Sequence, residues 1–314
     1  MQQYIFGIDI GGTSVKCGLF TADGELAEKW EIPTQRENAG AKVPQDIADT
    51  IKKKCEEKKL LKEQVLGVGL GVPGPVREDG YVSHCPNLGW RDMNVNEVMS
   101  SLTGLPARAA NDANVAALGE MWKGGGVGVK NMVLVTLGTG VGGGVIVEGK
   151  IVAGNGGAGG ELGHMVMNPD ETDVCGCGGY GHLEQYASAT GIVRMAKKRL
   201  AADDTATVLR NGELSAKAIF DAAKSGDALA QELVDSLGKT LATALAHVSA
   251  VTDPQAFVIG GGVSKAGQIL LDAISKHYNH GIMKALQDKE FRLATLGNDA
   301  GIYGCAKMIR SLFE

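Results

Sequence analysis

The chain has 314 residues, more than one hydrophobic core usually carries, and its 46 glycines are about twice the average usage, with no collagen-like period. Its 44% hydrophobic and 21% charged residues exclude a disordered chain. A net charge of −5 and 5% aromatic residues argue against a nucleic-acid partner, so we expect two globular lobes that do not bind polyanions in general.

The N-terminal segment and the cysteines indicate a compartment. The first residues lead directly into an apolar strand without the basic segment of a secretory signal, and no apolar run approaches the ~18 residues that span a bilayer. Of the 6 cysteines, only Cys175 and Cys177 are close in sequence, which does not suit a disulfide framework. We therefore expect a cytoplasmic protein with reduced thiols and no membrane partner.

The first third of the chain alternates β-prone runs with turns. Gly11-Gly12-Thr13 and Asp23-Gly24 separate three such runs, which predicts a meander of antiparallel strands with a glycine turn at its first corner. Apolar residues at helical spacing follow, and then a continuous apolar run that ends at a Pro-Gly-Pro turn. The predicted strands are 4–10, 14–20, 25–32 and 65–72, and the predicted helices are 45–63 and 113–122.

The same order of strand, glycine turn and strand recurs in the second half. Leucines four residues apart then predict a long buried helix, and two glycines in the final helical stretch, Gly301 and Gly304, suggest close helix packing. Two copies of one pattern suggest two lobes of similar plan that bind a nucleotide or substrate. The predicted strands are 132–137, 145–147, 151–152 and 256–259, the glycine turns are 138–144 and 260–262, and the helices are 229–251 and 265–277.

The second glycine turn contains a GxGxxG match that is not a dinucleotide fingerprint. A β-prone run follows it instead of a helix, and no Gly-Lys-Ser/Thr ends it, which excludes a Walker A loop. The remaining interpretation is a hairpin at Gly138, Thr139 and Gly140 whose amides face a phosphate, with the Thr139 hydroxyl adding a donor. The alternative is a plain hairpin turn.

The other two glycine turns extend this interpretation. Asp9 stands beside Gly11, Gly12 and Thr13, where an acid could hold Mg²⁺ directly or through water, and Lys16 could offset phosphate charge. The turn Gly260-Gly261-Gly262 would let a flat purine lie against the backbone. The alternatives are solvated charges at a strand end and a tight connection between a strand and a helix.

Asn111-Asp112 precedes a predicted helix, and both residue types are preferred helix N-caps. The functional interpretation is that Asp112 accepts a proton from a substrate hydroxyl that attacks a phosphate, while Asn111 hydrogen-bonds the same substrate. A polyol needs several convergent polar groups, because each unpaired buried one costs about 1–3 kcal/mol. Taken singly, the further candidates are ordinary loop or surface residues, and they are Asn87, Glu161, His164 and Glu184.

The glycine-rich segment from Cys175 to His182 has metal-ligand character. Cys175 and Cys177 cannot easily bridge to each other, and with His182 and the upstream His164 they make a set of two Cys and two His. Such a set suits a closed, tetrahedral Zn²⁺ site of the structural kind. The alternative is two reduced thiols in a loop.

Together these residues resemble the ROK family of sugar kinases and repressors, most closely its bacterial glucokinases. The resemblance runs from about residue 4 to the C-terminus. Four blocks carry it, namely Asp9-Ile-Gly-Gly-Thr13, Asn111-Asp112-Ala-Asn114, Leu137-Gly-Thr-Gly-Val-Gly-Gly-Gly144, and Glu161-Leu-Gly-His164 followed by Cys175-Gly-Cys177-Gly.

The resemblance implies an α/β protein with the two-lobed, actin-like (ribonuclease H-like) fold, each lobe a mixed sheet flanked by helices. It implies an N-terminal lobe of residues 1–118, with a helix at 301–314 packing back onto it, and a C-terminal lobe of residues 119–300. It further implies phosphorylation of D-glucose by ATP, with Mg²⁺, a structural Zn²⁺ and a homodimer. Asp112 matches the family's catalytic base, the two hairpins match its phosphate motifs and the Gly260 turn matches its adenosine side. The residues that match its sugar ligands are Asn87, Asn111, Glu161, His164 and Glu184.

One departure and several alternatives remain open. His182 stands where the family pattern has a third cysteine, which changes the reach of that ligand. A ROK repressor would carry a helix-turn-helix before the first strand, for which this sequence leaves no room, so we expect an enzyme. A sugar sensor without catalysis, a kinase for N-acetylmannosamine, fructose or another hexose, and a different phosphoryl donor are not distinguished by the sequence.

Overall fold

The computed structural model describes residues 2–314 and divides them into two compact units. The first unit contains residues 2–128, 144–160 and 296–314, and the second contains residues 129–143 and 161–295. The lobe boundaries implied by the family resemblance, 1–118 and 119–300, stay a prediction.

A five-stranded mixed sheet forms the centre of the first unit. The first three strands are antiparallel neighbours, as the alternating β-prone runs predict, and the remaining two add in parallel to the first. The strand order is β3-β2-β1-β4-β7. The strands are β1 (Tyr4–Ile10), β2 (Ser14–Thr21), β3 (Leu26–Pro33), β4 (Val65–Val72) and β7 (Ala107–Asn111).

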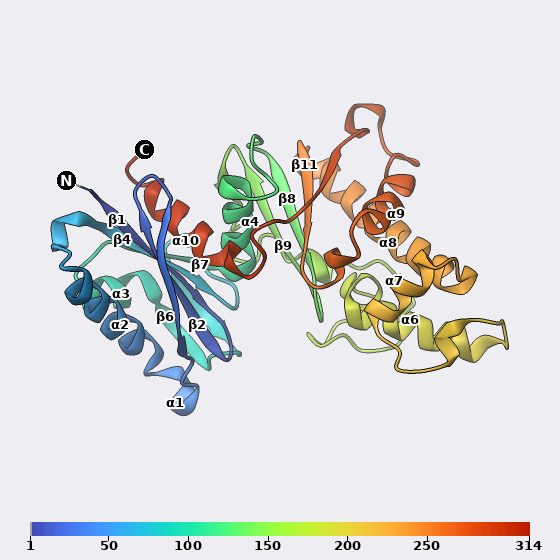
Figure 1. The fold of residues 1–314 in the computed structure, drawn as a ribbon, viewed down its shortest axis with the longest axis horizontal. Coiled ribbons are helices and arrows are strands. Elements are labelled where there is room, and N and C mark those ends of the chain that lie inside the picture. Colours follow the sequence, from blue (N-terminus) through green and yellow to red (C-terminus); the bar gives the residue numbers. More distant parts are fainter. Residues whose placement is uncertain (1) are drawn as a thin grey trace. The chain divides into compact units, whose positions relative to one another are not determined.

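Alternation along β1 sends its side chains to two different cores. Phe6 and Ile8 pack with residues of α2 and α3, whereas Ile5 packs with Ile302 and Ile309 of α10. The last helix therefore returns to the first strand, and Figure 1 shows α10 beside β1, β4 and α4. The helices are α1 (Glu37–Gly40), α2 (Val43–Lys58), α3 (Val95–Thr103), α4 (Asp112–Lys123) and α10 (Ala300–Arg310), and a separate hairpin consists of β5 (Tyr81–Cys85) and β6 (Trp90–Asn94).

The second sheet repeats the plan of the first. Its order is β10-β9-β8-β11-β12, with β11 parallel to both β8 and β12. This repetition was predicted from the recurring sequence pattern. The strands are β8 (Met132–Leu137), β9 (Val141–Val147), β10 (Lys150–Ile151), β11 (Ala256–Gly260) and β12 (Glu290–Leu293).

Helices cover the rest of the second unit. The predicted long helix is α8, whose leucines at positions 229, 233, 237, 241 and 245 are all buried. Two further helices, α6 and α7, were not predicted. The helices are α5 (Glu184–Ala187), α6 (Ala189–Ala202), α7 (Ala216–Lys224), α8 (Ala228–Thr252) and α9 (Gln268–Tyr278).

Three predicted boundaries are wrong for local reasons. The helix predicted over 45–63 ends at Lys58, because Lys59 adopts a left-handed conformation (φ 54°) that closes the helix. The helix predicted over 265–277 begins at Gln268, after a break at Gly267 (φ 77°). The strand predicted to begin at residue 145 begins at Val141, because β9 also includes glycines. One of these glycines lies where α4 packs closely, since a Cβ at Gly144 would lie 2.6 Å from the Ala117 Cβ.

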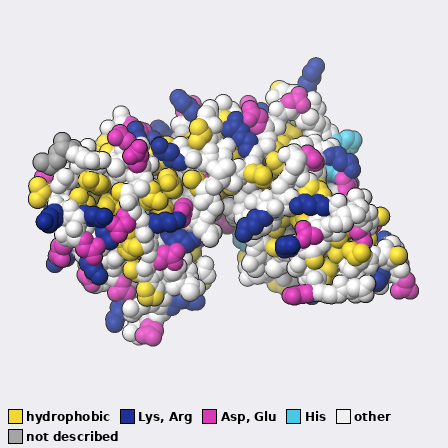
Figure 2. Space-filling view, viewed as in Figure 1, with side chains coloured by type: hydrophobic (Ala, Val, Ile, Leu, Met, Phe, Trp, Pro, Cys, Tyr) yellow, Lys and Arg dark blue, Asp and Glu magenta, His cyan; other side chains and the backbone are white. Residues whose placement is uncertain are grey.

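The distribution of surface charge and the state of the cysteines are as the composition suggests. On the face seen in Figure 2, positive and negative side chains are interspersed and neither sign forms a continuous patch. All six cysteines are free thiols. Across residues 2–314, no helix is both long and apolar enough to cross a membrane.

Candidate functional site

Two acids lie at one edge of the first sheet. Asp9 is the next-to-last residue of β1, and Asp112 is the first residue of α4, directly after β7. Both flank Gly71 of β4, where a Cβ would lie 3.2 Å from the Asp9 Oδ1 and 3.6 Å from the Asp112 Cα. The structure thus brings these two predicted residues together at the carboxyl ends of parallel strands, where open α/β sheets bind ligands.

Asp9 occupies a tight, buried position. Burial raises the pKa of its carboxyl, and the charge of Lys16, its partner across β1 and β2, acts in the opposite direction. A Cβ at Gly301 of α10 would lie 2.6 Å from the Asp9 Oδ2, so a larger residue there would displace the Asp9 side chain. Lys16 also donates to the Asn298 carbonyl at 3.3 Å.

Asn111 and Asp112 make the contacts of a helix N-terminus. Asn111 Oδ1 accepts from the Asn114 amide at 3.1 Å, and its Nδ2 donates to the Gly74 carbonyl at 3.2 Å. Asp112 Oδ1 accepts from the Ala113 amide at 2.8 Å. The capping role considered from the sequence is therefore present, and a role of Asn111 toward a sugar stays a prediction.

Asn87 is exposed on the loop between β5 and β6. The loop is closed by the pair of Cys85 and Trp90, and the Cys85 thiol donates to the Pro73 carbonyl at 3.2 Å. Pro73 precedes Gly74, the hydrogen-bond partner of Asn111. The loop of Asn87 and the start of α4 thus meet on the same turn of the chain.

The first hairpin, Gly11-Gly12-Thr13, joins β1 to β2. The Gly11 amide donates to the Ser14 carbonyl at 3.0 Å, which closes the turn. A Cβ at Gly12 would meet no atom within 4 Å. The outer side of the turn is therefore open to a ligand.

The second hairpin has a similar form in the second unit. The Gly138 amide donates to the Gly140 carbonyl at 3.0 Å, and Thr190 Oγ1 donates to the Thr139 carbonyl at 2.6 Å. A Cβ at Gly140 would lie 2.4 Å from the Glu184 Oε2, so this carboxylate rests against the hairpin. A cavity of about 480 Å³ opens beside it.

The Gly260-Gly261-Gly262 turn adjoins that hairpin. Gly261 has φ 81°, and a Cβ there would lie 2.5 Å from the Leu137 carbonyl oxygen, directly before Gly138. A side chain is thus excluded at Gly261 by both conformation and space. The residues predicted for phosphate and for adenosine are neighbours in the second unit.

Four residues form a cluster with the composition of a metal site. The ligand atoms of His164, Cys175, Cys177 and His182 all lie within 4.8 Å of one another. The Cys177 Sγ is 3.6 Å from the Cys175 Sγ and 3.2 Å from the His182 Nδ1. Zinc bonds of about 2.3 Å to sulfur and 2.0 Å to nitrogen place ligand atoms of a tetrahedral site about 3.3–3.8 Å apart, so the set fits zinc.

The two remaining acids lie beside this cluster. Glu161 Oε2 is 3.9 Å from the His164 Nε2, and the Cys175 thiol donates to the Glu184 Oε1 at 2.8 Å. Burial is the largest cause that raises the pKa of Cys175 to about 12, whereas a bound metal would hold it as a thiolate. The sugar candidates of the second unit therefore share one neighbourhood with the metal cluster.

Sequence reasoning missed Arg194 of α6. Its guanidinium binds Glu171 and donates to the Asp173 Oδ2 at 2.7 Å, and it lines the cavity beside Thr139. The hydrogen bond from Arg194 is the largest cause that holds the pKa of Glu171 well below its usual range. No motif could have found this arginine, because its partners lie more than 20 residues away on an irregular segment.

Comparisons with known proteins give one consistent result. The model of the family described as "ROK family" matches residues 5–311. A glucokinase from Halalkalibacterium halodurans is 42% identical over 98% of this chain and 96% of its own length, and an N-acetylmannosamine kinase from Shigella flexneri is 33% identical over 88% and 94%. A ROK family glucokinase from Streptomyces griseus, solved in complex with glucose and AMPPNP, is 33% identical, covers 98% of this chain and 99% of its own, and has a TM-score of 0.72.

Proposed function

The chain belongs to the ROK family, and from this membership we propose that it transfers the γ-phosphate of ATP to the 6-hydroxyl of D-glucose. The observation that carries the proposal is the 42% identity to a glucokinase over 98% of this chain. The neighbouring carboxylates of Asp9 and Asp112 and the open glycine hairpins support it, because phosphoryl transfer needs a base, charge stabilisation and positioning.

Asp112 is the proposed catalytic base. It accepts the proton of the 6-hydroxyl while that oxygen forms a bond to the γ-phosphorus, and the bond from this phosphorus to the bridging oxygen of ADP breaks. Its place at the start of a helix keeps the carboxylate in one orientation. Most of the rate gain should come from such positioning.

The phosphates of ATP would contact the hairpins Gly11-Gly12-Thr13 and Gly138-Thr139-Gly140. The open space at Gly12 and Gly138, where a Cβ would meet nothing within 4 Å, leaves room for them. Lys16 would offset phosphate charge, and Asp9 would hold Mg²⁺ directly or through water; this ion neutralises the charge that develops on the phosphates. The Gly260-Gly261-Gly262 turn would lie against the adenosine.

The sugar would be held by polar side chains. Asn87 and Asn111 would offer amide partners for its hydroxyls, and Glu161, His164 and Glu184 would offer carboxylate and imidazole partners. His164 has two ring nitrogens, so one can bind a metal while the other meets the sugar. Discrimination against other hexoses would follow from buried groups that the wrong sugar leaves unpaired.

The test is ADP release from Mg²⁺-ATP with glucose, N-acetylmannosamine, fructose and mannose, for the wild type and Asp112→Asn. We expect release with glucose and a loss of about 10³-fold in kcat in the variant, since the base alone contributes about 10²–10⁴-fold. Glucose binding by calorimetry should change little. Asp227→Asn is the matched control, because Asp227 also caps a helix through the Ala230 amide.

The outcomes distinguish a glucokinase from a kinase for another sugar and from a sugar sensor. Release with another sugar alone would keep the mechanism and replace the substrate. Near-normal turnover of Asp112→Asn would remove Asp112 from the mechanism. Glucose binding without ADP release in the wild type would indicate a sugar sensor.

We further propose that His164, Cys175, Cys177 and His182 hold a structural Zn²⁺. When bound, zinc would tie the loop to the segment of His164 and so keep the neighbouring acids in place. We expect about one zinc per chain by metal analysis, less in His182→Ala, and full occupancy in His182→Cys. His280→Ala, at an exposed position, is the control. Wild-type protein without stoichiometric zinc would contradict this proposal.

A homodimer is proposed from the family resemblance, and a cytoplasmic location is proposed from the free cysteines. Light scattering of the purified chain measures the first. Fractionation of cells that express the native gene measures the second. A monomeric mass at micromolar concentration would exclude a stable dimer.

A further inference from the structure

An unusual turn lies beside the loop that carries Asn87. Asn38, Ala39 and Gly40 have φ values of 50°, 55° and 64°, three left-handed residues in succession. Residues with a Cβ rarely adopt this conformation, and it persists only where neighbouring contacts hold it. The residues that contact this turn therefore show which neighbouring segment it holds in place.

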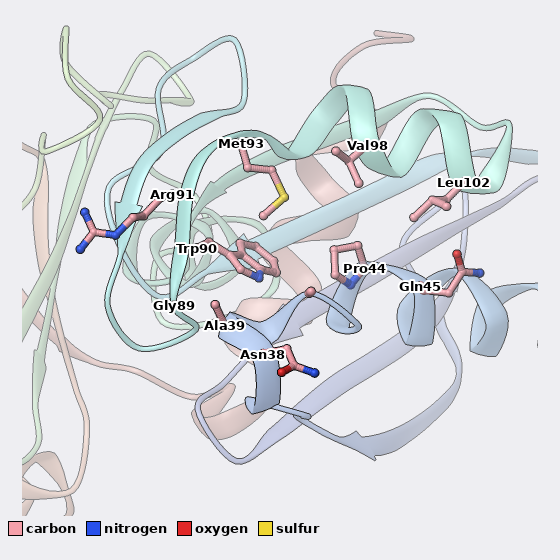
Figure 3. Close-up of a pocket in the computed structure, with 11 residues that line it drawn as sticks. Asn38, Ala39, Pro44, Gln45, Gly89, Trp90, Arg91, Met93, Val98 and Leu102 are labelled. Carbon is pink, nitrogen blue, oxygen red and sulfur yellow. The ribbon is translucent and has the colours of Figure 1, made fainter.

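The contacts come from the Asn87 loop and from Trp90. The buried Trp90 indole donates to the Gly40 carbonyl at 3.1 Å. A Cβ at Gly40 would lie 2.5 Å from the Leu88 carbonyl oxygen, and one at Gly89 would lie 2.8 Å from the Ala39 Cα. Figure 3 shows Ala39, Gly89 and Trp90 close together at one end of a cavity of about 580 Å³. The loop and the turn are thus in direct backbone contact.

The loop itself is short and closed. Residues 86–89 connect the paired Cys85 and Trp90, and the amides of Leu88 and Gly89 both donate to the Cys85 carbonyl, at 3.2 and 2.9 Å. One end of the loop is fixed to Pro73 through the Cys85 thiol. Its other end is fixed through Trp90 and the left-handed turn, and the Leu88 side chain is buried in the core, so the exposed Asn87 depends on these anchors.

We propose that Trp90 is a positioning residue for glucose binding: through its hydrogen bond to Gly40 it seats the 86–89 loop on the left-handed turn and so orients Asn87. The inference rests on the proposed function, in which Asn87 binds the sugar. Trp90 itself is 3% exposed and so offers almost no surface to a substrate. The effect should therefore appear in the affinity for glucose and not in the chemical step.

The test compares Trp90→Phe with Trp30→Phe. Phenylalanine keeps an aromatic ring but removes the indole donor, and Trp30 makes an equivalent bond to the Thr50 hydroxyl at 3.0 Å in the same unit, away from the loop. We expect Trp90→Phe to raise KM for glucose about fivefold, as one lost hydrogen bond does, with KM for ATP and kcat unchanged. Trp30→Phe should leave all three constants unchanged. Equal changes in both variants, or a fall in kcat alone, would overturn the proposal.

A second measurement separates this inference from the proposed function. Hydrogen exchange at the Leu88 and Gly89 amides should be faster in Trp90→Phe than in the wild type or in Trp30→Phe, whichever sugar the enzyme uses. Unchanged exchange would refute the anchoring even if the chain is a glucokinase. If Trp90→Phe does not fold, Gly40→Ala, whose Cβ would lie 2.5 Å from the Leu88 carbonyl oxygen, should displace the loop from the turn and raise KM for glucose at least twofold. An unchanged KM and unchanged exchange in that variant would also overturn the proposal.

Discussion

Asp9 shows how a single buried acid can oppose stability. Its carboxylate is enclosed by Gly71 of β4 and Gly301 of α10, and burial raises its pKa above the ordinary value of 3.8. The folded state therefore holds the proton more tightly than the unfolded chain does. The stability contributed by this group is fully present below its ordinary pKa and is lost as the pH rises through the raised folded pKa.

Asp9→Asn should therefore stabilise the protein while it impairs catalysis. The amide has the shape of the carboxyl but cannot ionise, so we expect Tm to rise by about 2–4 °C at pH 8, as about 1 kcal/mol would produce. The gain should be smaller at pH 4, because the raised pKa leaves more of the native carboxyl protonated there than at pH 8. Scanning calorimetry at both pH values, with ADP release as the second readout, measures this. A stabilised variant with normal turnover would exclude Asp9 from the site.

Short sequence motifs predicted the candidate residues at turns, but they could not predict contacts between segments that are distant in sequence. Asp9, Asp112 and the cysteine pair each belong to a local pattern with a chemical meaning, and the structure places Asp9 beside Asp112. Arg194 has no such pattern, because its partners are fixed by the folding of an irregular segment onto α6. The close approach of Glu184 to Gly140 is likewise a product of tertiary structure.

Among the elements, the crossing of α4 and α10 is the tightest. A Cβ at Gly304 would lie 1.6 Å from the Val115 carbonyl oxygen, and one at Gly119 would lie 2.1 Å from the Ala300 carbonyl oxygen. The sequence predicted close packing at Gly301 and Gly304. Gly304 confirms it, whereas Gly301 makes room for the Asp9 carboxylate. Spacing along a helix could not distinguish these two reasons for a glycine.

Gly304→Ala should destabilise the first unit strongly. Alanine gains about 1 kcal/mol in helix propensity, but its methyl group would meet backbone atoms that cannot rotate away. We expect a net loss of about 3 kcal/mol in the free energy of unfolding, measured by urea titration. Gly262→Ala is the control, because Gly262 has helical angles and open space at the Cβ position. A loss of similar size in both variants would contradict the steric explanation.

At the scale of the whole molecule, the repeated sheet plan was predictable and the composition of the first unit was not. Two copies of the pattern of strand, glycine turn and strand were enough to predict two sheets of one design. The return of the last helix to the first strands was implied by the family resemblance alone. Such a contact joins residues almost 300 positions apart, as in the thiol of Cys305 on the Ile8 carbonyl, and no local pattern encodes it.

Deletion of residues 300–314 should therefore destabilise the N-terminal strands of the first unit. Ile302, Ala306 and Ile309 cover Ile5 and Phe20, and without them this apolar face of the sheet meets water. We expect rapid proteolysis within residues 2–128, read by mass spectrometry of the fragments. Deletion of residues 312–314, which are exposed, is the control. Equal resistance of both truncated chains would show that α10 is dispensable for folding.

The three-segment composition of the first unit also affects its synthesis. A ribosome delivers β1 and β2 first and α10 last, so every segment of the second unit has emerged before the first can close. Ile5 and Phe20 remain without their covering helix for nearly the whole time of translation, so we expect chaperones to bind the exposed apolar surface of the nascent chain. Slow codons near the end of the gene would prolong this exposure, whereas slow codons before those of Ile5 would not.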